Sequence, residues 1–347
     1  MVLTGPPLAL GPARTTLLGW PGYNIPSCIV TPSTLPELPS TDASPSPTAS
    51  DTIDGPLVTI GLPVFNASRY LSGCLTALVG QTYRNIRIVI SDNASTDDTV
   101  AICEGYAARD ARIAIVRTDK NGGAGWNHRR VRELAKGTYF RWQGADDTIA
   151  PSFVAACVAA LEANPQAVLA YPLTTIIDDD GVVVRKTSDR LPLDASDPRV
   201  RFAALLSPWS ITHSPFYGVM RLSATATLPP FGAFLASDRT FLAELALRGP
   251  FVQVGEYLMF RRHHAKHTTQ TDKSEREHMD PETAHKFRPR EFRVLREHLG
   301  AAWRAPASPI RKLRYFASLG SWVIARRETF IMEAREHVGH LARRRGA

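Results

Sequence analysis

The amino-acid sequence predicts an α/β fold built on a parallel sheet. Strand-like segments expected at Leu57–Leu62, Ile86–Ser91, Ile113–Val116 and Tyr139–Gln143 alternate with helical segments, so strand and helix repeat three times before the fourth strand. Such repeats form parallel sheets with crossover helices. Ligands of open α/β sheets bind beyond the carboxyl ends of the strands. We therefore expect a ligand site where these four strands end.

The intervening helices are indicated by apolar residues at helical spacing. On the first helix these residues are Tyr70, Leu71, Cys74, Leu75 and Leu78. The second helix follows Ser95 and Asp98, which have the spacing of an N-terminal capping pair. The third follows the glycine loop Asn121–Gly125 and runs through Ala135. The glycine loop should therefore lie at the same sheet edge as the strand ends.

Beyond Pro151, a helix leads into strands at Ala167–Tyr171, Thr174–Ile177 and Val182–Arg185. The last two strands flank Asp178-Asp179-Asp180-Gly181. Three aspartates in a row could bind a cation, but Asp-Gly between β-branched runs is typical of a hairpin turn. We therefore predict a turn rather than a metal site at this position.

The second half of the chain offers fewer regular patterns. Residues 186–208 are expected to form a loop, which Trp209–Met220 follows. A helix is expected at Arg239–Leu247 and a strand at Phe251–Phe260. Beyond Lys273 the pattern changes to charged helices.

Two adjacent carboxylates, Asp146 and Asp147, follow the strand Tyr139–Gln143 and one glycine. Neighbouring carboxylates repel each other, and a divalent cation relieves that repulsion. Hard cations such as Mg²⁺ or Mn²⁺ prefer oxygen ligands, and a cation with open positions can bind a diphosphate. The alternative is a solvated turn that caps the helix near Pro151.

Four segments together resemble a family 2 glycosyltransferase. They are Val58–Asn66, Gln81-Thr82-Tyr83, Ser91–Asp97 and Gly137–Asp147, in the order and spacing of that family. The resemblance is specific over roughly residues 57–150 and weaker to about Thr269. It implies the GT-A fold, a Rossmann-like nucleotide-diphospho-sugar transferase architecture with a mixed sheet flanked by helices, here followed by a C-terminal helical extension.

The resemblance also implies a donor site. The aspartate after the second strand, here Asp92, would bind the nucleotide base, Asp146 would lie on the ribose side, and Asp147 would bind the metal, Mn²⁺ or Mg²⁺. Further donor-site candidates are Pro63, Phe65, Asn66, Asn127 and Arg130. The usual form of the motif is Asp-x-Asp or three aspartates. Ala145 stands where the first acid would be, which puts strong metal binding in doubt.

The resemblance places a catalytic base at the start of the helix after Phe231–Leu235. Asp238 stands there, preceded by Ser237 where an acidic pair is common. An inverting transferase needs one carboxylate to take the proton of the acceptor hydroxyl. Asp is also a favoured helix cap, which is the competing interpretation.

Three histidines lie in the basic segment Arg261–Thr269. They make a weak zinc site, because no cysteine or acid spacing supports one. Some GT-A enzymes place a histidine of a late loop at the metal, so His264 is the first candidate for a further metal ligand and His267 the second. The alternative is a basic loop without a ligand.

The net charge of +8 is unevenly placed. Arg261–Ala347 carries 20 Lys and Arg against 10 Asp and Glu, so this segment alone is +10. Such a segment favours anionic partners.

An apolar stripe at helical spacing lies in the same segment. It consists of Ile310, Leu313, Phe316, Leu319 and Val323, beside Arg311, Lys312 and Arg314. This stripe could pack on the catalytic domain or lie on an anionic membrane. No interleaved aromatic pattern supports nucleic-acid binding.

Composition divides the chain into three parts. Residues 1–54 are rich in Pro, Ser and Thr and predict a disordered tail. Residues 55–272 form the expected GT-A domain, and residues 273–347 a basic helical extension. No signal peptide or membrane span is recognised, and the four cysteines are scattered, so we expect a cytoplasmic protein, peripheral at the inner face of the membrane if the basic helices bind lipid.

The leading prediction is an inverting, metal-dependent glycosyltransferase of the hexosyltransferase type, as in bacterial polysaccharide or glycoconjugate synthesis. It would move a sugar from a nucleotide-diphosphate donor to a hydroxyl of a glycan, a lipid-linked intermediate or a small molecule. Nucleotidyl transfer is less favoured, because Pro63-Val64-Phe65-Asn66 replaces the basic glycine-rich loop of that class. A degenerate sugar-nucleotide-binding protein is the non-enzymatic alternative.

Overall fold

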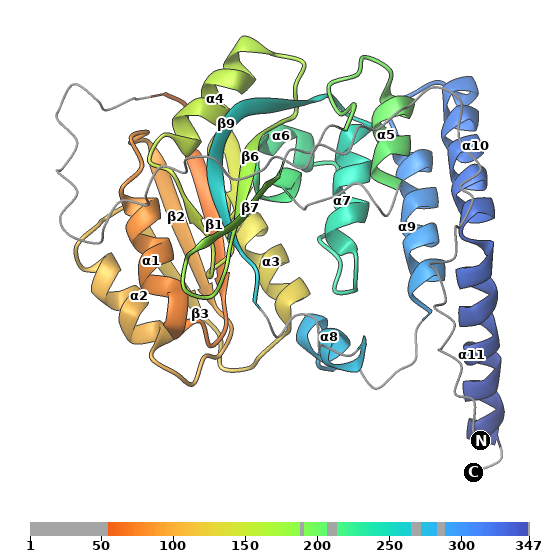
Figure 1. Cartoon of the computed structure of the whole chain (residues 1–347), viewed down its shortest axis with the longest axis horizontal. Coiled ribbons are helices and arrows are strands. Elements are labelled where there is room, and N and C mark those ends of the chain that lie inside the picture. Colours follow the sequence, from red (N-terminus) through yellow and green to blue (C-terminus); the bar gives the residue numbers. More distant parts are fainter. Residues whose placement is uncertain (1–54, 188–190, 207–213, 265–271, 283–288, 346–347) are drawn as a thin grey trace, which may run out of the picture. The chain divides into compact units, whose positions relative to one another are not determined.

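A computed structural model describes residues 55–187, 191–206, 214–264, 272–282 and 289–345. Among these residues, nine strands form one mixed sheet in the order β3-β2-β1-β4-β8-β6-β9-β5, with β7 paired to β6 (Figure 1). The strands are β1 (Val58–Val64), β2 (Ile86–Asp92), β3 (Ile113–Arg117), β4 (Tyr139–Trp142), β5 (Thr148–Ile149), β6 (Leu169–Ile177), β7 (Val183–Thr187), β8 (Val219–Arg221) and β9 (Phe251–Arg262). The parallel pairing predicted for the first four strands is confirmed.

Helices cover both faces of this sheet, which explains why β1 and β2 are apolar and buried along nearly their whole length. The helices are α1 (Ser68–Val79), α2 (Thr99–Ala107), α3 (Ala124–Glu133), α4 (Phe153–Ala163), α5 (Pro198–Leu206), α6 (Leu222–Thr225), α7 (Ser237–Ala246), α8 (Asp272–Met279), α9 (Arg290–Arg304), α10 (Pro309–Ala325) and α11 (Arg327–Arg345). One core cluster joins the sheet to α1, α2 and α4, and a second joins it to α3, α5, α7, α9 and α10. In Figure 1, α9 and α10 lie beyond α7 on this second side.

The second core centres on Trp142, the last residue of β4. Its side chain is fully buried and stacks on Phe216 at a centroid distance of 4.7 Å. Phe140 and Phe241 meet it edge-on at 4.9 and 5.0 Å. The indole Nε1 donates a hydrogen bond to the carbonyl oxygen of His128 at 3.0 Å. The strand end that carries Asp146 and Asp147 is therefore anchored on its apolar side.

Two expected boundaries in the middle of the chain were wrong. Ala167–Tyr171 and Thr174–Ile177 form a single strand, β6, which continues through Pro172 because the pairing with β9 shifts its register there. Residues 186–208 are not only loop, because α5 begins at Pro198. Its start could have been recognised, since a proline at the first helical position follows Asp197, whose Oδ1 accepts the N–H of Arg199 at 2.9 Å.

The capping pair expected at Ser95 and Asp98 was also wrong. Helix α2 begins at Thr99, and Asp98 makes no side-chain cap. Asp97 instead accepts the backbone N–H of Thr99 and that of Ser68, both at 3.1 Å. Burial alone would raise the pKa of Asp97, but these hydrogen bonds outweigh it and hold the pKa at about 2. One carboxylate therefore serves the N-termini of α1 and α2 together.

The predicted tail, residues 1–54, lies outside the described residues. The boundary expected near residue 272 stays a prediction, although α9 and α10 share a core with α5 and α7.

The apolar stripe of α10 is partly buried and partly exposed. Leu319 is buried and Phe316 and Val323 pack against the core, whereas Ile310 and Leu313 are 75% and 66% exposed. No helix in the described part of the chain has the length and hydropathy needed to cross a membrane.

Candidate active site

The carboxyl ends of six strands meet at one edge of the sheet. Strands β1 to β4 are parallel, β8 is antiparallel to β4, and β6 is antiparallel to β8, so β6 points the same way as β4. Strand β9 is parallel to β6. Asp92 ends β2, the Asp146-Asp147 pair follows β4, and Arg262 ends β9. As predicted, the carboxyl ends of β1 to β4 lie at one edge of the sheet. Strands β6 and β9 end at the same edge.

On the β1–β2 side, two loops are tied together by side chains. Asp92 is only 2% exposed, and both its carboxylate oxygens lie near the N–H of Ser95, at 3.3 and 3.4 Å. Asn66 adopts φ +47°, and its Oδ1 accepts the N–H of Thr96 at 2.8 Å. Phe65 next to it is 39% exposed, and Pro63 is half-buried. These residues form a fixed wall beside the end of β2.

Asn127 and Arg130 of α3 have structural partners in this conformation. Asn127 is 2% exposed and donates from Nδ2 to the carbonyl oxygens of Val64 and Ser91, at 3.2 and 2.9 Å. Arg130 donates to the carbonyl oxygen of Arg117 at 3.0 Å, and its guanidinium lies 5.0 Å from the centroid of the Trp126 ring. Asn127 therefore joins the ends of β1 and β2.

The turn that carries Asp146 and Asp147 is tight. A Cβ atom on Gly144 would lie 2.8 Å from Oδ2 of Asp147, so a larger residue there would displace this carboxylate. The side-chain amide of Gln143 closes the turn by donating to the carbonyl oxygens of Gly144 and Asp147, at 2.9 and 3.0 Å. Asp147 is 2% exposed, and burial, followed by the charge of Asp146, raises its pKa to about 7. Its Oδ1 accepts the N–H of Arg262 at 2.8 Å.

Strand register explains why Arg262 lies at this turn. Strand β5 pairs antiparallel with β9, with Thr148 opposite Phe260, so the residues before β5 face those after Phe260. On the other side, β6 pairs parallel with β9, with Ile177 opposite Arg262. The residues after β4, after β6 and after β9 are thereby brought together.

His264 occupies the centre of this junction. Its Nε2 lies 2.9 Å from Oδ2 of Asp146, and its Nδ1 lies 2.6 Å from Oδ1 of Asp179. Burial alone would lower the pKa of His264, but the hydrogen bonds to Asp179 and Asp146 raise it. The same contact with His264, followed by that with Tyr70, holds the pKa of Asp179 at about 2. The predicted turn at Asp178–Gly181 is confirmed, with Gly181 at φ +87°, but one of its aspartates also reaches the site.

Asp238 lies in the first turn of α7 as expected. The preceding Ala236 adopts φ +68°, a left-handed conformation that alanine rarely takes. Burial raises the pKa of the Tyr217 hydroxyl, and the charges of Asp147, Asp146 and Asp238 raise it further. Asp238 is therefore in electrostatic contact with the same neighbourhood as Asp146 and Asp147.

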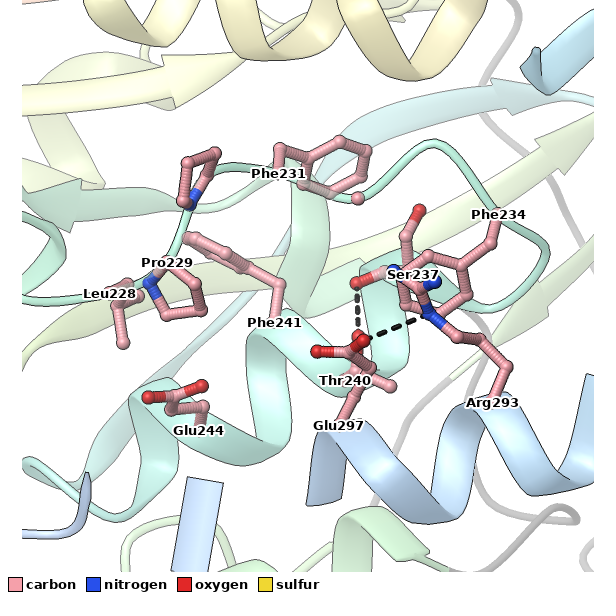
Figure 2. A pocket seen from close by; sticks show the side chains of 12 residues that line it. Leu228, Pro229, Phe231, Phe234, Ser237, Thr240, Phe241, Glu244, Arg293 and Glu297 are labelled. Carbon is pink, nitrogen blue, oxygen red and sulfur yellow. Dashed lines mark hydrogen bonds and ion pairs between the residues drawn. The ribbon is translucent and has the colours of Figure 1, made fainter. Parts of the chain in front are cut away.

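A hollow lies beside α7, between the segment 228–234 and α9 (Figure 2). Its α7 lining consists of Ser237, Thr240, Phe241 and Glu244, which repeat at helical spacing. Asp238 follows Ser237 by about 100° around the helix, so it belongs to a different face. The hollow is therefore not assigned to the acceptor.

The donor atoms at the junction fit a divalent cation with few protein ligands. Two neighbouring ligands of an octahedral Mg²⁺ lie roughly 3 Å apart, since each is about 2.1 Å from the ion. Asp146 Oδ2 and His264 Nε2 are 2.9 Å apart, whereas one oxygen of Asp147 is held by a backbone N–H. In the described ranges, no group of three or more His, Cys, Asp or Glu side chains could hold a metal ion. His267 lies outside the described residues.

Three residues of this junction were not singled out by sequence reasoning as part of the site. They are Tyr70, Asp179 and Arg262. Tyr70 donates from its hydroxyl to Oδ1 of Asp179 at 2.8 Å, and the Arg262 guanidinium lies 4.4 Å from the centroid of the Tyr70 ring. These residues reach the site through the register in which β5 and β6 pair with β9. Patterns of neighbouring residues in the sequence do not reveal this register.

Comparisons with known proteins agree with this architecture. The model of the Glycosyl transferase family 2 matches residues 59–224. Glycosyltransferase GlyG of Streptococcus pneumoniae is 30% identical over 98 residues, which are 28% of this chain and 33% of that protein. Chondroitin synthase of Escherichia coli is 29% identical over 129 residues, 37% of this chain and 19% of that protein. The chain thus spans a third or less of the length of these two relatives.

Solved structures show the same fold. S. aureus TarS 1–349 has a TM-score of 0.57 at 14% identity, and the match covers 78% of this chain and 72% of that chain. Structures of the same TarS fragment in complex with UDP and with UDP-GlcNAc match at 15% and 17% identity, each with a TM-score of 0.57. The chain therefore shares the GT-A fold of these structures, and its residues 59–224 match the model of the Glycosyl transferase family 2.

Proposed function

We propose that this protein is an inverting, metal-dependent glycosyltransferase that moves a sugar from a nucleotide-diphosphate donor to a hydroxyl acceptor. The observation that carries the proposal is that Asp92 and the Asp146-Asp147 pair follow strand ends at one edge of a GT-A sheet, while Asp238 stands in the first turn of α7. Each carboxylate comes from a different strand end or helix start, apart from the adjacent pair. The acceptor is a glycan, a lipid-linked intermediate or a small molecule.

A uridine diphosphate sugar is the proposed donor class, because the TarS structures with this fold contain UDP and UDP-GlcNAc. The nucleotide base would contact Asp92 and the neighbouring residues Pro63, Phe65 and Asn66. Asp146 would lie on the ribose side of the nucleotide. Asn127 and Arg130 would act from α3, where Asn127 already fixes the ends of β1 and β2.

His264 and one carboxylate of the Asp146-Asp147 pair, with Asp147 as the first candidate, would hold the divalent cation, and His267 is a second histidine candidate. When bound, Mn²⁺ or Mg²⁺ supplies charge that stabilises the departing diphosphate. Asp238 accepts the proton of the acceptor hydroxyl as its oxygen attacks the anomeric carbon.

The product's stereochemistry tests this proposal against a retaining transferase and against a binding protein without activity. The protein is incubated with an α-linked UDP-sugar, Mn²⁺ and simple sugar acceptors, and the anomeric proton of any product is followed by NMR. A β-linked product is expected. An α-linked product would contradict the inverting mechanism, and no product with any donor would favour the degenerate binding protein.

We further propose that the start of α10 contacts an anionic membrane. Trp303, Ile310 and Leu313 are 71%, 75% and 66% exposed, and Arg311 and Arg314 beside them are exposed as well. Residues 303–327 contain six Arg and Lys and no Asp or Glu. Like charges would oppose pairing of two copies through this surface, whereas anionic lipids complement it.

Replacing both Ile310 and Leu313 by Ser should therefore reduce binding to vesicles that contain anionic phosphatidylglycerol by roughly tenfold or more, because two exposed apolar anchors are lost. Co-sedimentation with such vesicles measures the binding. The matched control replaces Val182 and Val184, which are 61% and 59% exposed on another surface, by Ser. Equal binding by wild type and both variants would remove the membrane contact from this account.

A further inference from the structure

We propose that Asp179, in the turn between β6 and β7, is a positioning residue that fixes the ring of His264 toward Asp146. Tyr70 of α1 holds Asp179 in place for this task. The proposal rests on the proposed function, because His264 and Asp146 belong to the cation site of the donor. It adds to that function a carboxylate that never touches the donor and acts only through the histidine.

Each ring nitrogen of His264 lies within hydrogen-bond distance of a carboxylate oxygen. Nδ1 lies 2.6 Å from Oδ1 of Asp179, and Nε2 lies 2.9 Å from Oδ2 of Asp146. Both carboxylates only accept hydrogen bonds, so each ring nitrogen donates in this conformation. If a cation took the place of the Nε2 proton, the contact with Asp179 would keep the proton on Nδ1 and hold the ring in this orientation. Metal-binding histidines commonly have such a carboxylate behind them, which fixes the orientation and tautomer of the ring.

Tyr70 fixes the carboxylate in turn. Its hydroxyl donates to the same Oδ1 of Asp179 at 2.8 Å, and its ring centroid lies 5.3 Å from that of His264. Helix α1 is firmly packed beneath, since Leu71, Cys74, Leu75 and Leu78 are buried. Three elements, α1, the β6–β7 turn and the end of β9, therefore converge on one carboxylate oxygen.

The turn itself does not need the Asp179 carboxylate. Nη1 of Arg262 donates to the carbonyl oxygens of Asp178 and Asp179, at 2.6 and 3.0 Å, and so ties the turn to β9 through the backbone. Within the turn, Oδ1 of Asp178 accepts the N–H groups of Asp180 and Val182, at 3.0 and 2.8 Å. The side chain of Asp179 can therefore be removed while the hairpin keeps its anchors.

Because the hairpin does not depend on the Asp179 side chain, this side chain can be removed and compared with a control in the same turn. Asp180 lies in the same turn and is exposed. Asp179→Ala and Asp180→Ala remove the same charge one residue apart. Isothermal titration of the whole protein with UDP, GDP and dTDP, each with and without Mn²⁺, first identifies the nucleotide that wild type binds.

For that nucleotide, Asp179→Ala is expected to lower the affinity measured with Mn²⁺ by roughly 10–100-fold, the usual effect of losing a partner of a metal-binding histidine. The affinity without Mn²⁺ should change less than about twofold, because Asp179 does not contact the nucleotide. Asp180→Ala should match wild type in both conditions, and Tyr70→Phe should show part of the Asp179→Ala loss.

Histidine ¹⁵N NMR without metal gives a readout that a structural role would not move. In wild type the Nδ1 signal of His264 should be that of a protonated nitrogen hydrogen-bonded to a carboxylate, and this signature should be lost in Asp179→Ala. An unchanged Nδ1 signal, an equal loss of affinity with and without Mn²⁺, or an equal loss in Asp180→Ala would each overturn the inference. A wild type that binds none of the nucleotides would instead overturn the proposed function.

Discussion

Asp238→Asn should lower the turnover number for sugar transfer by roughly 10²–10⁴-fold, because it removes the group that accepts the acceptor's proton. The amide keeps the size of the side chain but has no basic oxygen of comparable strength. Affinity for the nucleotide should change little, since Asp238 lies at the start of α7 rather than at the strand ends that we propose as the donor site. Turnover is measured with saturating donor, and affinity by titration with the free nucleotide.

Glu328→Gln is the matched control for this variant. Asp238 is the acidic residue in the first turn of α7, and Glu328 has the same position in α11. Glu328 is exposed. Both substitutions remove a charge that interacts with a helix N-terminus, which contributes about 0.3–1 kcal/mol to stability. If both variants lost only stability and Asp238→Asn kept its turnover, Asp238 would be a helix cap and not the base.

Trp142→Ala should lower the free energy of unfolding by roughly 3–5 kcal/mol, because it empties the centre of the aromatic core. The indole is fully buried against Phe140, Phe216 and Phe241 and also loses its hydrogen bond to His128. For a domain of this size the melting temperature should fall by on the order of 10 °C. Urea denaturation and thermal scanning measure the two quantities.

The same substitution at Trp303 provides the comparison. Trp303 is 71% exposed at the end of α9, so Trp303→Ala should change the unfolding free energy by less than about 0.5 kcal/mol. Similar losses in the two variants would mean that Trp142 does not lie at the centre of a packed core. The nucleotide affinity of Trp142→Ala is informative as well, because β4 ends at Trp142 and carries the Asp146-Asp147 turn.

Local patterns in the sequence carry much of this architecture. Strands β1 to β4 and helices α1 and α4 could be predicted, because their apolar residues repeat with the period of the element and are buried on both sides of the sheet. The position of Asp92 at the end of β2 followed from the strand boundary alone. The helix start at Asp238 was predictable in the same way, since an acidic residue precedes an apolar helix face.

What could not be predicted depends on pairing between distant segments. Asp179 was interpreted only as a turn residue, and its turn is indeed a hairpin. Its second role arises because β9 pairs with β6 on one side and β5 on the other, which aligns residues about 85 positions apart. Such a register is set by the whole sheet, so a run of three aspartates cannot reveal which of them will meet His264.

The most direct test of the donor site is thermal denaturation of wild type and Asp147→Ala with UDP, GDP and dTDP, each with and without Mn²⁺. A ligand that binds only the folded protein raises the melting temperature, by the equivalent of about 2.7 kcal/mol at one hundred times its dissociation constant. We expect UDP to stabilise wild type more strongly when Mn²⁺ is present, and this additional stabilisation to disappear in Asp147→Ala. No stabilisation of wild type by any of the three nucleotides would contradict the donor site and return the two aspartates to a solvated turn.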